Sequence, residues 1–242
     1  MRHYSFKPGW ASAISTLLLL PLFISLGLWQ LHRAEEKEAL IELRNRHASS
    51  SELILGSDPR PIDELRYRNV LARGHYDSEH QFLLDNQVLD RQVGYYVLTP
   101  LKLEGSDRHV LVNRGWVPAL SERTQLPNIS IAEVPAHVRG TVEKFPSVGL
   151  RLAGAEIPAP GWPAVVQVLD ARALCERLGY PLLPYQVLLA VSQPEGYVRN
   201  WKPANVDPGK NRGYALQWFC FAAILLLLFL RHGWKPKTAS RR

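Results

Sequence analysis

Cysteines and catalytic motifs are scarce in this sequence. Its 242 residues include two cysteines, Cys175 and Cys220, and no disulfide is expected because Cys220 falls inside an apolar run. A disulfide-stapled scaffold is therefore excluded. The sequence also contains no GxSxG, P-loop, HExxH or CxxC pattern. Without a catalytic constellation an enzyme is the weaker class of function, and we expect a protein that is not an enzyme.

The isolated reactive side chains have simple interpretations. Cys175 lies in a helix-like stretch and is interpreted as a small buried hydrophobe rather than a nucleophile. His75, His80, His109 and His137 are interpreted as surface side chains rather than metal ligands, since the spacing of the first two suits no metal geometry well. No metal site is predicted.

Acidic residues are missing from both ends of the chain. Residues 1–31 contain two basic residues and no acid, and residues 231–242 contain five basic residues and no acid. The other 22 of the 29 basic residues balance the 22 acidic ones, so the formal charge of +7 belongs to the ends. Nucleic-acid binding usually needs a basic face on a folded domain, so no nucleic-acid partner is expected.

Two uncharged apolar runs adjoin these basic ends. Residues 11–31 are long enough, at about 1.5 Å per residue, to cross a hydrocarbon core of about 30 Å. Their bulky end, LGLWQLHR, favours an uncleaved anchor over a signal peptide. Residues 214–230 supply a second, shorter span, whose flanking arginines can extend it by snorkelling. The sequence therefore predicts two transmembrane helices, with membrane lipids as their surroundings.

The basic ends also predict the topology. Lys and Arg are enriched on the cytoplasmic side of spans, so both termini are expected inside and the central region outside, in the periplasm of a bacterium with the spans in its inner membrane. The expected organisation is a cytoplasmic tail at 1–10, a transmembrane helix at 11–31, a helical stalk at 32–50, a periplasmic β-rich domain at 51–213, a second transmembrane helix at 214–230 and a basic cytoplasmic tail at 231–242.

The central region has the pattern of a β domain. Short runs of strand length, such as HQFLLDNQV, GYYVLTPLKL and YQVLLAV, are separated by turn residues. Between the linker at 49–61 and the second span, only 170–179 are helix-like, with an Asp cap and a closing Gly. Strands that follow strands favour antiparallel pairing. The predicted fold class is a membrane protein of α+β type, with two transmembrane helices around a mainly antiparallel β domain, an open sheet or a barrel, and a small helix.

Tryptophan and glutamine are paired at one end of both apolar runs. The first run ends with Trp29 and Gln30, followed by His32 and Arg33, and the second begins with Tyr214, Gln217 and Trp218. One interpretation is an aromatic belt at the headgroups, with wetted glutamines. The other is a hairpin in which these seven residues line a shared site for a ligand or a partner helix.

The segment LVNRGWVP at 111–118 places four distinctive residues in sequence: Asn113, Arg114, Gly115 and Trp116. One interpretation is a strand with an arginine stacked on an aromatic ring and a glycine bulge. The other is a planar donor and an indole presented to a carboxylate or a partner surface. On the second interpretation these four residues bind a partner.

The sequence resembles the SURF1 family in three segments, which are GLWQLHRAEEK at 27–37, LVNRGWVP at 111–118 and GYALQWF at 213–219. GYYVLTPL at 94–101 and ARGHYD at 72–77 are also similar. Members of this family have a transmembrane helix at each end of a domain that faces the periplasm or the mitochondrial intermembrane space. The resemblance implies an assembly factor for haem-copper terminal oxidases, chiefly cytochrome c oxidase.

The resemblance also implies a cofactor and partners. Bacterial members bind haem A on its way to oxidase subunit I, so haem A, subunit I and haem A synthase are expected to interact with this chain. Haem A would stack on Trp29 and Trp218, with Arg33 near a propionate. The implied function is help in delivering haem A to subunit I, and the alternative is a haem-free scaffold that stabilises oxidase subunits during assembly.

One position departs from the family. A histidine commonly lies three residues before the tyrosine that opens the second span, and this chain has Asn211 there. An amide is a poor axial ligand for haem iron, whereas imidazole is a good one. Three accounts stay open: haem held by stacking and propionate contacts, ligation by His32 instead, or a scaffold that does not bind haem tightly.

Overall fold

The structure is a computed structural model that describes residues 4–56, 60–131, 135–147, 149, 154–201 and 206–236. The chain divides into two compact units. The hairpin unit comprises Met1–Glu42 and Pro203–Arg242, and the β domain comprises Leu43–Lys202.

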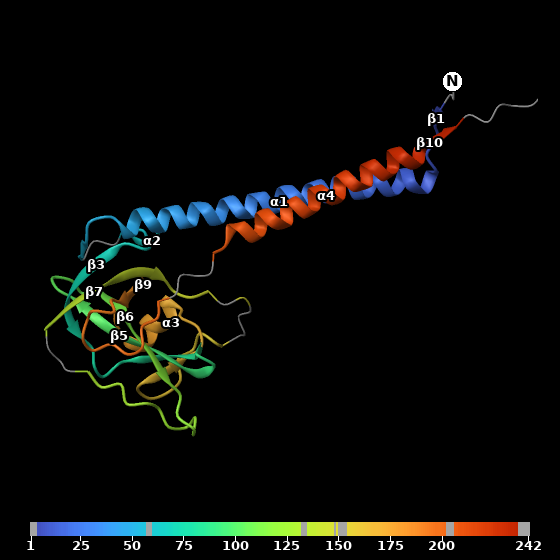
Figure 1. The fold of residues 1–242 in the computed structure, drawn as a ribbon. Helices are drawn as coiled ribbons and strands as arrows, with labels where there is room; N and C mark the ends of the chain where they lie inside the picture. Colours follow the sequence, from blue (N-terminus) through green and yellow to red (C-terminus); the bar gives the residue numbers. More distant parts are fainter. Residues whose placement is uncertain are drawn as a thin grey trace, which may run out of the picture. The chain divides into compact units, whose positions relative to one another are not determined.

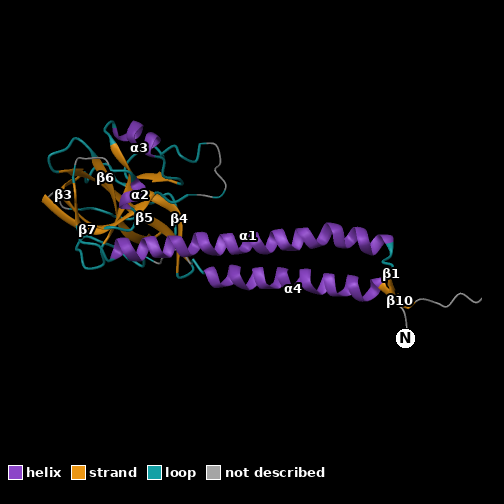
Figure 2. Cartoon of the chain, turned by 90° about the horizontal axis from the view of Figure 1, so that it is seen from above, coloured by secondary structure: helices purple, strands orange, loops and turns teal. Residues whose placement is uncertain are grey.

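The hairpin unit is built on two long helices. Helix α1 spans Trp10–Ala48, with its last residues in the β domain, and α4 spans Pro208–Gly233. The two run antiparallel and side by side in both views (Figures 1 and 2). Both are long and apolar enough to cross a membrane, and only 11% of each apolar stretch is buried, so neither is the core helix of a soluble domain. The residues of the predicted span at 11–31 and most of the predicted stalk lie in one continuous helix, α1.

Small side chains let the two helices approach closely. Gly27 of α1 faces Phe219 of α4, and a Cβ on Gly27 would lie 2.6 Å from the Phe219 ring. Ala34 and Ala215 are almost fully buried, although both lie on helices whose other side chains are mostly exposed. Helices pack through small residues in lipid because apolar burial alone does not drive them together there. The face of α1 that carries Gly27 and Ala34 therefore contacts α4.

A two-stranded ribbon joins the far ends of the hairpin. Strand β1, Tyr4–Phe6, pairs antiparallel with β10, Trp234–Pro236, so the segment before α1 meets the segment after α4 (Figure 1). We call this the ribbon end, and the opposite end, where α4 begins, the Asn211 end.

The β domain is a closed barrel with added edge strands. Its strands are β2 (Leu53–Leu55), β3 (Asn69–Tyr76), β4 (Phe82–Leu89), β5 (Gln92–Leu103), β6 (His109–Pro118), β7 (Pro135–Lys144), β8 (Ala164–Val166) and β9 (Leu182–Leu189). The sheet order is β2-β3-β7-β9-β6-β5-β4-β8, and an extra pairing of β3 with β5 closes five strands into a barrel. Most pairs are antiparallel, as predicted, and β2–β3, β4–β8 and β6–β9 are parallel.

Closure of the barrel depends on a glycine. Gly74 of β3 pairs with Leu103 of β5, and a Cβ at position 74 would lie 1.8 Å from the Lys102 carbonyl oxygen. The barrel interior is filled by alternate residues of its strands, chiefly valines and leucines, together with Tyr76 and Tyr185. A second apolar cluster lies under the small helix α3, Ala171–Leu178.

The fold class predicted from the sequence is confirmed, with two helices around a mainly antiparallel β domain that contains a small helix. The predicted helix has the expected ends, since Asp170 caps its first turn and Gly179 ends it in the left-handed conformation. Four short elements were not predicted. They are β2 in the expected linker, helix α2 (Ile62–Leu65), and strands β1 and β10 in the expected tails. His109 was expected at the surface and this is wrong: its ring is buried and stacks on Tyr180.

Candidate functional site

A chain of polar groups joins the two helices at the Asn211 end. The Asn211 side-chain Nδ2 donates to Gln30 Oε1 at 2.6 Å, and Lys37 Nζ donates to Asn211 Oδ1 at 2.6 Å. Lys37 Nζ also lies 3.4 Å from the carbonyl oxygen of Asp207, the residue that caps α4. Both ends of the Asn211 amide are therefore engaged by side chains of α1.

Helical spacing explains why these groups meet. Gln30, Ala34 and Lys37 are separated by four and three residues, so they lie on the one face of α1 that contacts α4. Asn211 lies one turn before the buried Ala215, on the matching face of α4. Sequence reasoning did not identify Lys37, but its position seven residues after Gln30 could have placed it on the contact face.

One flank of the hairpin is marked by an ion pair. Arg212 Nη2 lies 2.7 Å from Glu38 Oε1, and these residues are rotated by about +100° from Asn211 and about +80° from Gln30. In an antiparallel pair, rotations of the same sign on the two helices lead to the same flank. The Arg212–Glu38 ion pair therefore lies on the flank of positive rotation of both helices.

The other flank carries four of the predicted site residues. Trp29 and Arg33 are rotated by about −100° and −60° from Gln30, and Tyr214 and Gln217 by about −60° and −120° from Asn211. All four side chains are exposed. They therefore share a flank, which we call the Trp29 flank, opposite the Arg212–Glu38 ion pair.

The remaining predicted site residues lie in different surroundings. Trp218 belongs to the contact between the helices, where its ring stacks on Phe23 with centroids 5.8 Å apart. His32 is rotated by about 200° from Gln30, on the face of α1 away from α4, and its ring lies 3.3 Å from Glu36. The structure thus brings Gln30 to Asn211 and leaves His32 outside the hairpin.

Exposed aromatic side chains mark two levels along the hairpin. Trp10 and Trp29 are 19 residues apart on α1, which is roughly 28 Å of helix. Tyr214 lies 19 residues before Gly233, the last residue of α4, and Trp234 follows directly. This separation matches the hydrocarbon thickness of a bilayer, about 30 Å. The aromatic-belt interpretation therefore suits Trp29 and Tyr214, whereas Trp218 is packed within the hairpin.

The polar side chains at the Asn211 end are paired with one another across the two helices. The Asn211 amide, where the resemblance led us to expect a histidine, is hydrogen-bonded to Gln30 and Lys37. His32 faces away from α4, so it supplies no imidazole to the contact between the helices. What the Trp29 flank does offer is an indole and a phenol at the level of Arg33, groups that suit contact with a flat ring carrying acidic substituents.

The run at 113–116 is buried in the β domain. Arg114 has 1% of its surface exposed, and its Nη1 donates to Gln81 Oε1 at 3.0 Å and to the Ile129 carbonyl at 3.2 Å. Its Nε donates to the Glu195 carbonyl at 2.8 Å, and its Cζ lies 5.1 Å from the centre of the Tyr197 ring. Burial lowers the pKa of Arg114, but a guanidinium stays charged in proteins.

The neighbours of Arg114 dock the same segment of chain. Trp116 exchanges two backbone hydrogen bonds with Val198, at 2.8 and 3.2 Å, and the Tyr197 amide donates to the Arg114 carbonyl. Gly115 has φ of +117°, and a Cβ there would lie 2.8 Å from the Val198 carbonyl oxygen. The run therefore holds residues 195–198, which precede α4 in the chain.

This is the arrangement of the first interpretation, a strand with an arginine stacked on an aromatic ring and a glycine bulge, since the register of β5 and β6 shifts at Arg114. Asn113 is also turned inward and donates to Gln186 Oε1 at 3.1 Å. Asn113, Arg114 and Trp116 are buried in the β domain, and their contact with a partner stays a prediction.

A second polar cluster surrounds Asp77. Its carboxylate accepts a hydrogen bond of 2.6 Å from the Tyr180 hydroxyl, and His80 Nδ1 lies 2.8 Å from it. Burial alone would raise the pKa of Asp77, but the hydrogen bonds from Tyr180 and His80 together hold that pKa below its ordinary value. The same carboxylate accepts from the His80 amide, so the cluster fixes the turn between β3 and β4.

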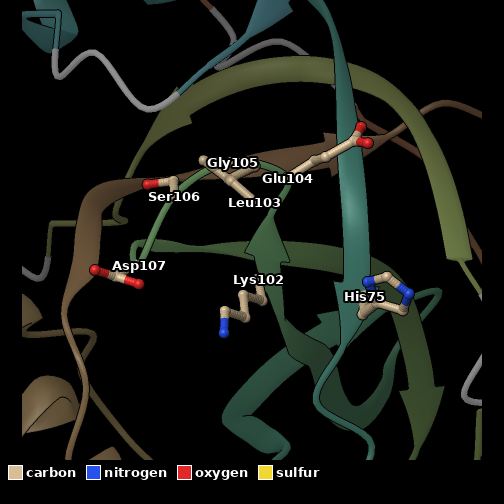
Figure 3. Close-up of a pocket in the computed structure, with 7 residues that line it drawn as sticks. All are labelled: His75, Lys102, Leu103, Glu104, Gly105, Ser106 and Asp107. Atoms are coloured by element: carbon tan, nitrogen blue, oxygen red, sulfur yellow. The ribbon is translucent and has the colours of Figure 1, made fainter.

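A surface hollow of about 520 Å³ lies where the barrel closes. It is lined by His75 of β3, by Lys102 and Leu103 of β5 and by the turn at 104–107 (Figure 3). Lys102 and Glu104 point away from each other. The lining combines one lysine with the acidic residues Glu104 and Asp107, so its charges are mixed. None of its residues belongs to the predicted site. Among the described residues, no group of three or more His, Cys, Asp or Glu side chains could hold a metal ion.

Comparison with known proteins identifies a family over most of the chain. The sequence profile of the SURF1 family matches residues 17–223, which include the whole β domain and most of both helices. The chain is similar to Surfeit locus protein 1 of Xenopus tropicalis, with 36% identity over 118 residues that cover 42% of this chain and 38% of that protein.

Two further relatives show the same likeness. The SURF1-like protein of Caenorhabditis elegans is 24% identical over 249 residues, which cover 91% of this chain and 74% of that protein. The SURF1-like protein of Drosophila melanogaster is 33% identical over 118 residues, which cover 42% of this chain and 39% of that protein. The matched region thus spans less than two fifths of the Xenopus and Drosophila proteins.

Proposed function

Because the chain belongs to the SURF1 family, we propose that it is an assembly factor for a haem-copper terminal oxidase, chiefly cytochrome c oxidase. It acts beside subunit I, which it helps to receive haem A, and it takes that haem from haem A synthase. It is not an enzyme on this proposal, because its work is to hold groups and subunits rather than to change bonds.

The proposed setting is the inner membrane of a bacterium. Helices α1 and α4 cross it as a hairpin, with both termini in the cytoplasm and the β domain in the periplasm. The separation of the exposed aromatic residues supports this placement, as does the basic character of both chain ends. The Asn211 end then lies at the outer face of the membrane.

The observation that carries the proposal is the shared Trp29 flank. Trp29 and Arg33 of α1 lie on the same side of the hairpin as Tyr214 and Gln217 of α4. Haem A has a porphyrin plane, an apolar tail and two propionates, so it belongs where an apolar helix surface meets polar groups. On this proposal Gln217 is retained because it faces a polar-edged haem or subunit contact rather than lipid alone.

A haem-free scaffold is the second candidate, and Asn211 favours it. The amide at this position joins α1 to α4 through Gln30 and Lys37, a structural role that needs no cofactor. On this candidate the chain stabilises oxidase subunits during assembly without carrying haem itself.

The first experiment is an absorption spectrum of the full chain, purified in detergent from cells that make haem A, with pyridine-haemochrome quantification. Near-stoichiometric haem A supports delivery, and its loss in a Trp29→Leu, Gln217→Leu variant locates the site on the Trp29 flank. Cys220→Leu, at an exposed position of α4 away from that flank, is the matched control and keeps the haem. His32→Ala tests the remaining histidine, and haem lost in that variant assigns the iron ligand to His32.

Oxidase activity in a deletion strain separates the candidates. Protein without haem that still restores oxidase establishes the scaffold. A chain that restores no more oxidase than an empty vector, although it is present in the membrane, refutes the assembly function in both forms.

A further inference from the structure

The ribbon end is a tightly packed structure rather than a pair of loose tails. The Lys7 amide donates to the Gly233 carbonyl at 2.7 Å, next to the three pairs of residues that β1 and β10 form. The Phe6 ring contacts the rings of Phe229 and Trp234, with centroids 5.5 and 6.1 Å apart. A Cβ on Gly233 would lie 2.2 Å from the Phe6 ring, so glycine is required there for this packing.

Positive charge at this end has no acidic counterpart. Residues 1–34 and 208–242 contain no Asp or Glu, so the nearest acids in sequence lie toward the Asn211 end. Lys7 and Arg231 are exposed, and neither forms an ion pair with another described residue. Five further basic residues belong to these ends in the sequence: Arg2, Lys235, Lys237, Arg241 and Arg242. Uncompensated cations of this density attract an anionic surface.

Aromatic side chains place these cations at headgroup depth. Trp10 is 79% exposed at the start of α1, and Trp234 is 55% exposed just after α4. Exposed indoles at the ends of apolar helices seat at the level of lipid headgroups, where the ring meets the acyl chains and the N–H meets water. Lys7 and Arg231 lie within three residues of these indoles in the chain, so their charges fall at the phosphates.

We infer that the ribbon end is a binding surface for acidic phospholipids, in which Lys7 and Arg231 contact the headgroup phosphates while Trp10 and Trp234 sit among the headgroups. This goes beyond oxidase assembly and requires only that α1 and α4 cross a membrane. Clusters of four to eight Lys and Arg residues beside a span bind anionic lipids, with about 1 kcal/mol from each residue near the surface.

Both chain ends build this surface together. Lys7 follows β1, and Arg231 lies in the last turn of α4, and the backbone ribbon holds the two segments side by side. A lipid bound there contacts both ends and opposes their separation, so acidic lipid stabilises the closed hairpin. A zwitterionic lipid carries no net charge and gains little from this arrangement.

The test measures lipid preference directly. The full chain, purified in detergent, is mixed with equal amounts of phosphatidylglycerol and phosphatidylcholine, and bound lipids are counted by native mass spectrometry. We expect several-fold enrichment of phosphatidylglycerol. Lys7→Gln and Arg231→Gln are each expected to lower the affinity for phosphatidylglycerol about fivefold. The Lys7→Gln, Arg231→Gln double variant is expected to lose the enrichment, and raised salt is expected to weaken it.

A matched control carries the same charge change elsewhere. Arg91→Gln with Arg172→Gln removes two exposed arginines of the β domain and is expected to keep the preference of the unmodified chain. Equal retention of the two lipids by the unmodified chain would overturn the inference, as would equal losses in the ribbon-end and control variants.

A second measurement serves if the Lys7→Gln, Arg231→Gln variant does not fold. Lipids brominated on their acyl chains quench tryptophan fluorescence. The part of the quenching that is lost in a Trp10→Phe, Trp234→Phe variant reports lipid at the ribbon end. In nanodiscs of mixed lipids, brominated phosphatidylglycerol should quench this component more than brominated phosphatidylcholine. Equal quenching by the two lipids refutes the preference.

Discussion

The Asn211 side chain donates a hydrogen bond of 2.6 Å to Gln30 Oε1 while it accepts one from Lys37, so one amide ties α4 to two successive turns of α1. Asn211 therefore has a structural role in joining the two helices. A polar group between two helices in an apolar setting is costly when unpaired, and each of these groups has its partner.

A double-mutant cycle measures the strength of this contact. Gln30→Ala and Asn211→Ala are expected to couple by about 0.6 kcal/mol and by at most about 1.7 kcal/mol, the mean and the maximum for hydrogen bonds between membrane helices. Unfolding of the full chain in mixed micelles, followed by tryptophan fluorescence, provides the free energies. Arg33→Ala with Gln217→Ala, which share a flank without a hydrogen bond, should be additive. Additivity in the Gln30–Asn211 cycle would contradict the contact.

Arg114 offers a test of the buried network in the β domain. Arg114→Met removes the donor from three internal oxygens and is expected to destabilise the domain by about 3 kcal/mol. Arg114→Lys keeps the charge but not the planar set of donors, so it should recover little of this loss. Thermal unfolding followed by circular dichroism measures both.

The matched control for Arg114 is Arg172, which is exposed on α3 and pairs with Glu176, one turn away. Arg172→Met is expected to change the midpoint by less than a degree or two, since exposed pairs contribute little. A loss in Arg172→Met as large as that in Arg114→Met would show that the network around Arg114 adds nothing specific.

Alanine substitutions at Gly105 and Gly115 distinguish the cost of backbone strain from the cost of steric crowding. Both have positive φ, but a Cβ at 115 would press on the Val198 carbonyl, whereas at 105 nothing lies within 4 Å. Gly105→Ala is therefore expected to cost about 1 kcal/mol and Gly115→Ala about 3 kcal/mol or more. Limited proteolysis should also cut residues 195–198 faster in Gly115→Ala. Equal costs at the two positions would contradict a docking role for Gly115.

The β domain was predictable because its strands are local patterns. Alternating apolar residues and turn residues marked the strands of the barrel and α3 in the sequence, and the structure has them there. Closure was not predictable, because the pairing of Gly74 with Leu103 joins strands far apart in sequence through a close backbone approach. The short element β2 was missed because three residues carry too little periodicity.

The grouping of residues along each helix could be predicted from the sequence, but the contact between the helices could not. Spacing along one helix grouped Tyr214 with Gln217 and Trp218, but spacing cannot tell which face meets the other helix. That is decided by small residues such as Gly27 and Ala34, whose role appears only in packing. Trp218 therefore turned out to pack on Phe23, and Asn211 turned out to bind Gln30.

His109 was missed for a different reason, since a single histidine at the start of a strand gives no sign of burial. Its ring stacks on Tyr180 with centroids 3.8 Å apart, and its Nδ1 has no hydrogen-bond partner among the described residues. Burial lowers the pKa of His109 below 6.5, an effect that Lys102 adds to and Asp77 opposes. The folded protein therefore favours the neutral ring.

This shift sets a pH dependence of known sign. Below pH 6.5 the unfolded chain takes up a proton at His109 that the folded chain does not, so the free energy of unfolding falls as the pH is lowered from 6.5 toward the folded pKa. The slope from this residue is at most about 1.4 kcal/mol per pH unit. The lowered pKa of Asp77 acts in a separate window, below 3.8, where its protonation removes further stability.

His109→Phe isolates the first window. Phenylalanine keeps a flat ring against Tyr180 and fills the same buried position, but it does not titrate. Thermal unfolding of the full chain in detergent should show the variant losing less stability than the unmodified protein between pH 6.5 and 5. Above pH 7 the stability of both proteins should change with pH in the same way. If both proteins lose stability equally across that interval, another group carries the acid sensitivity. His109 would then be protonated as readily in the folded chain as in the unfolded one.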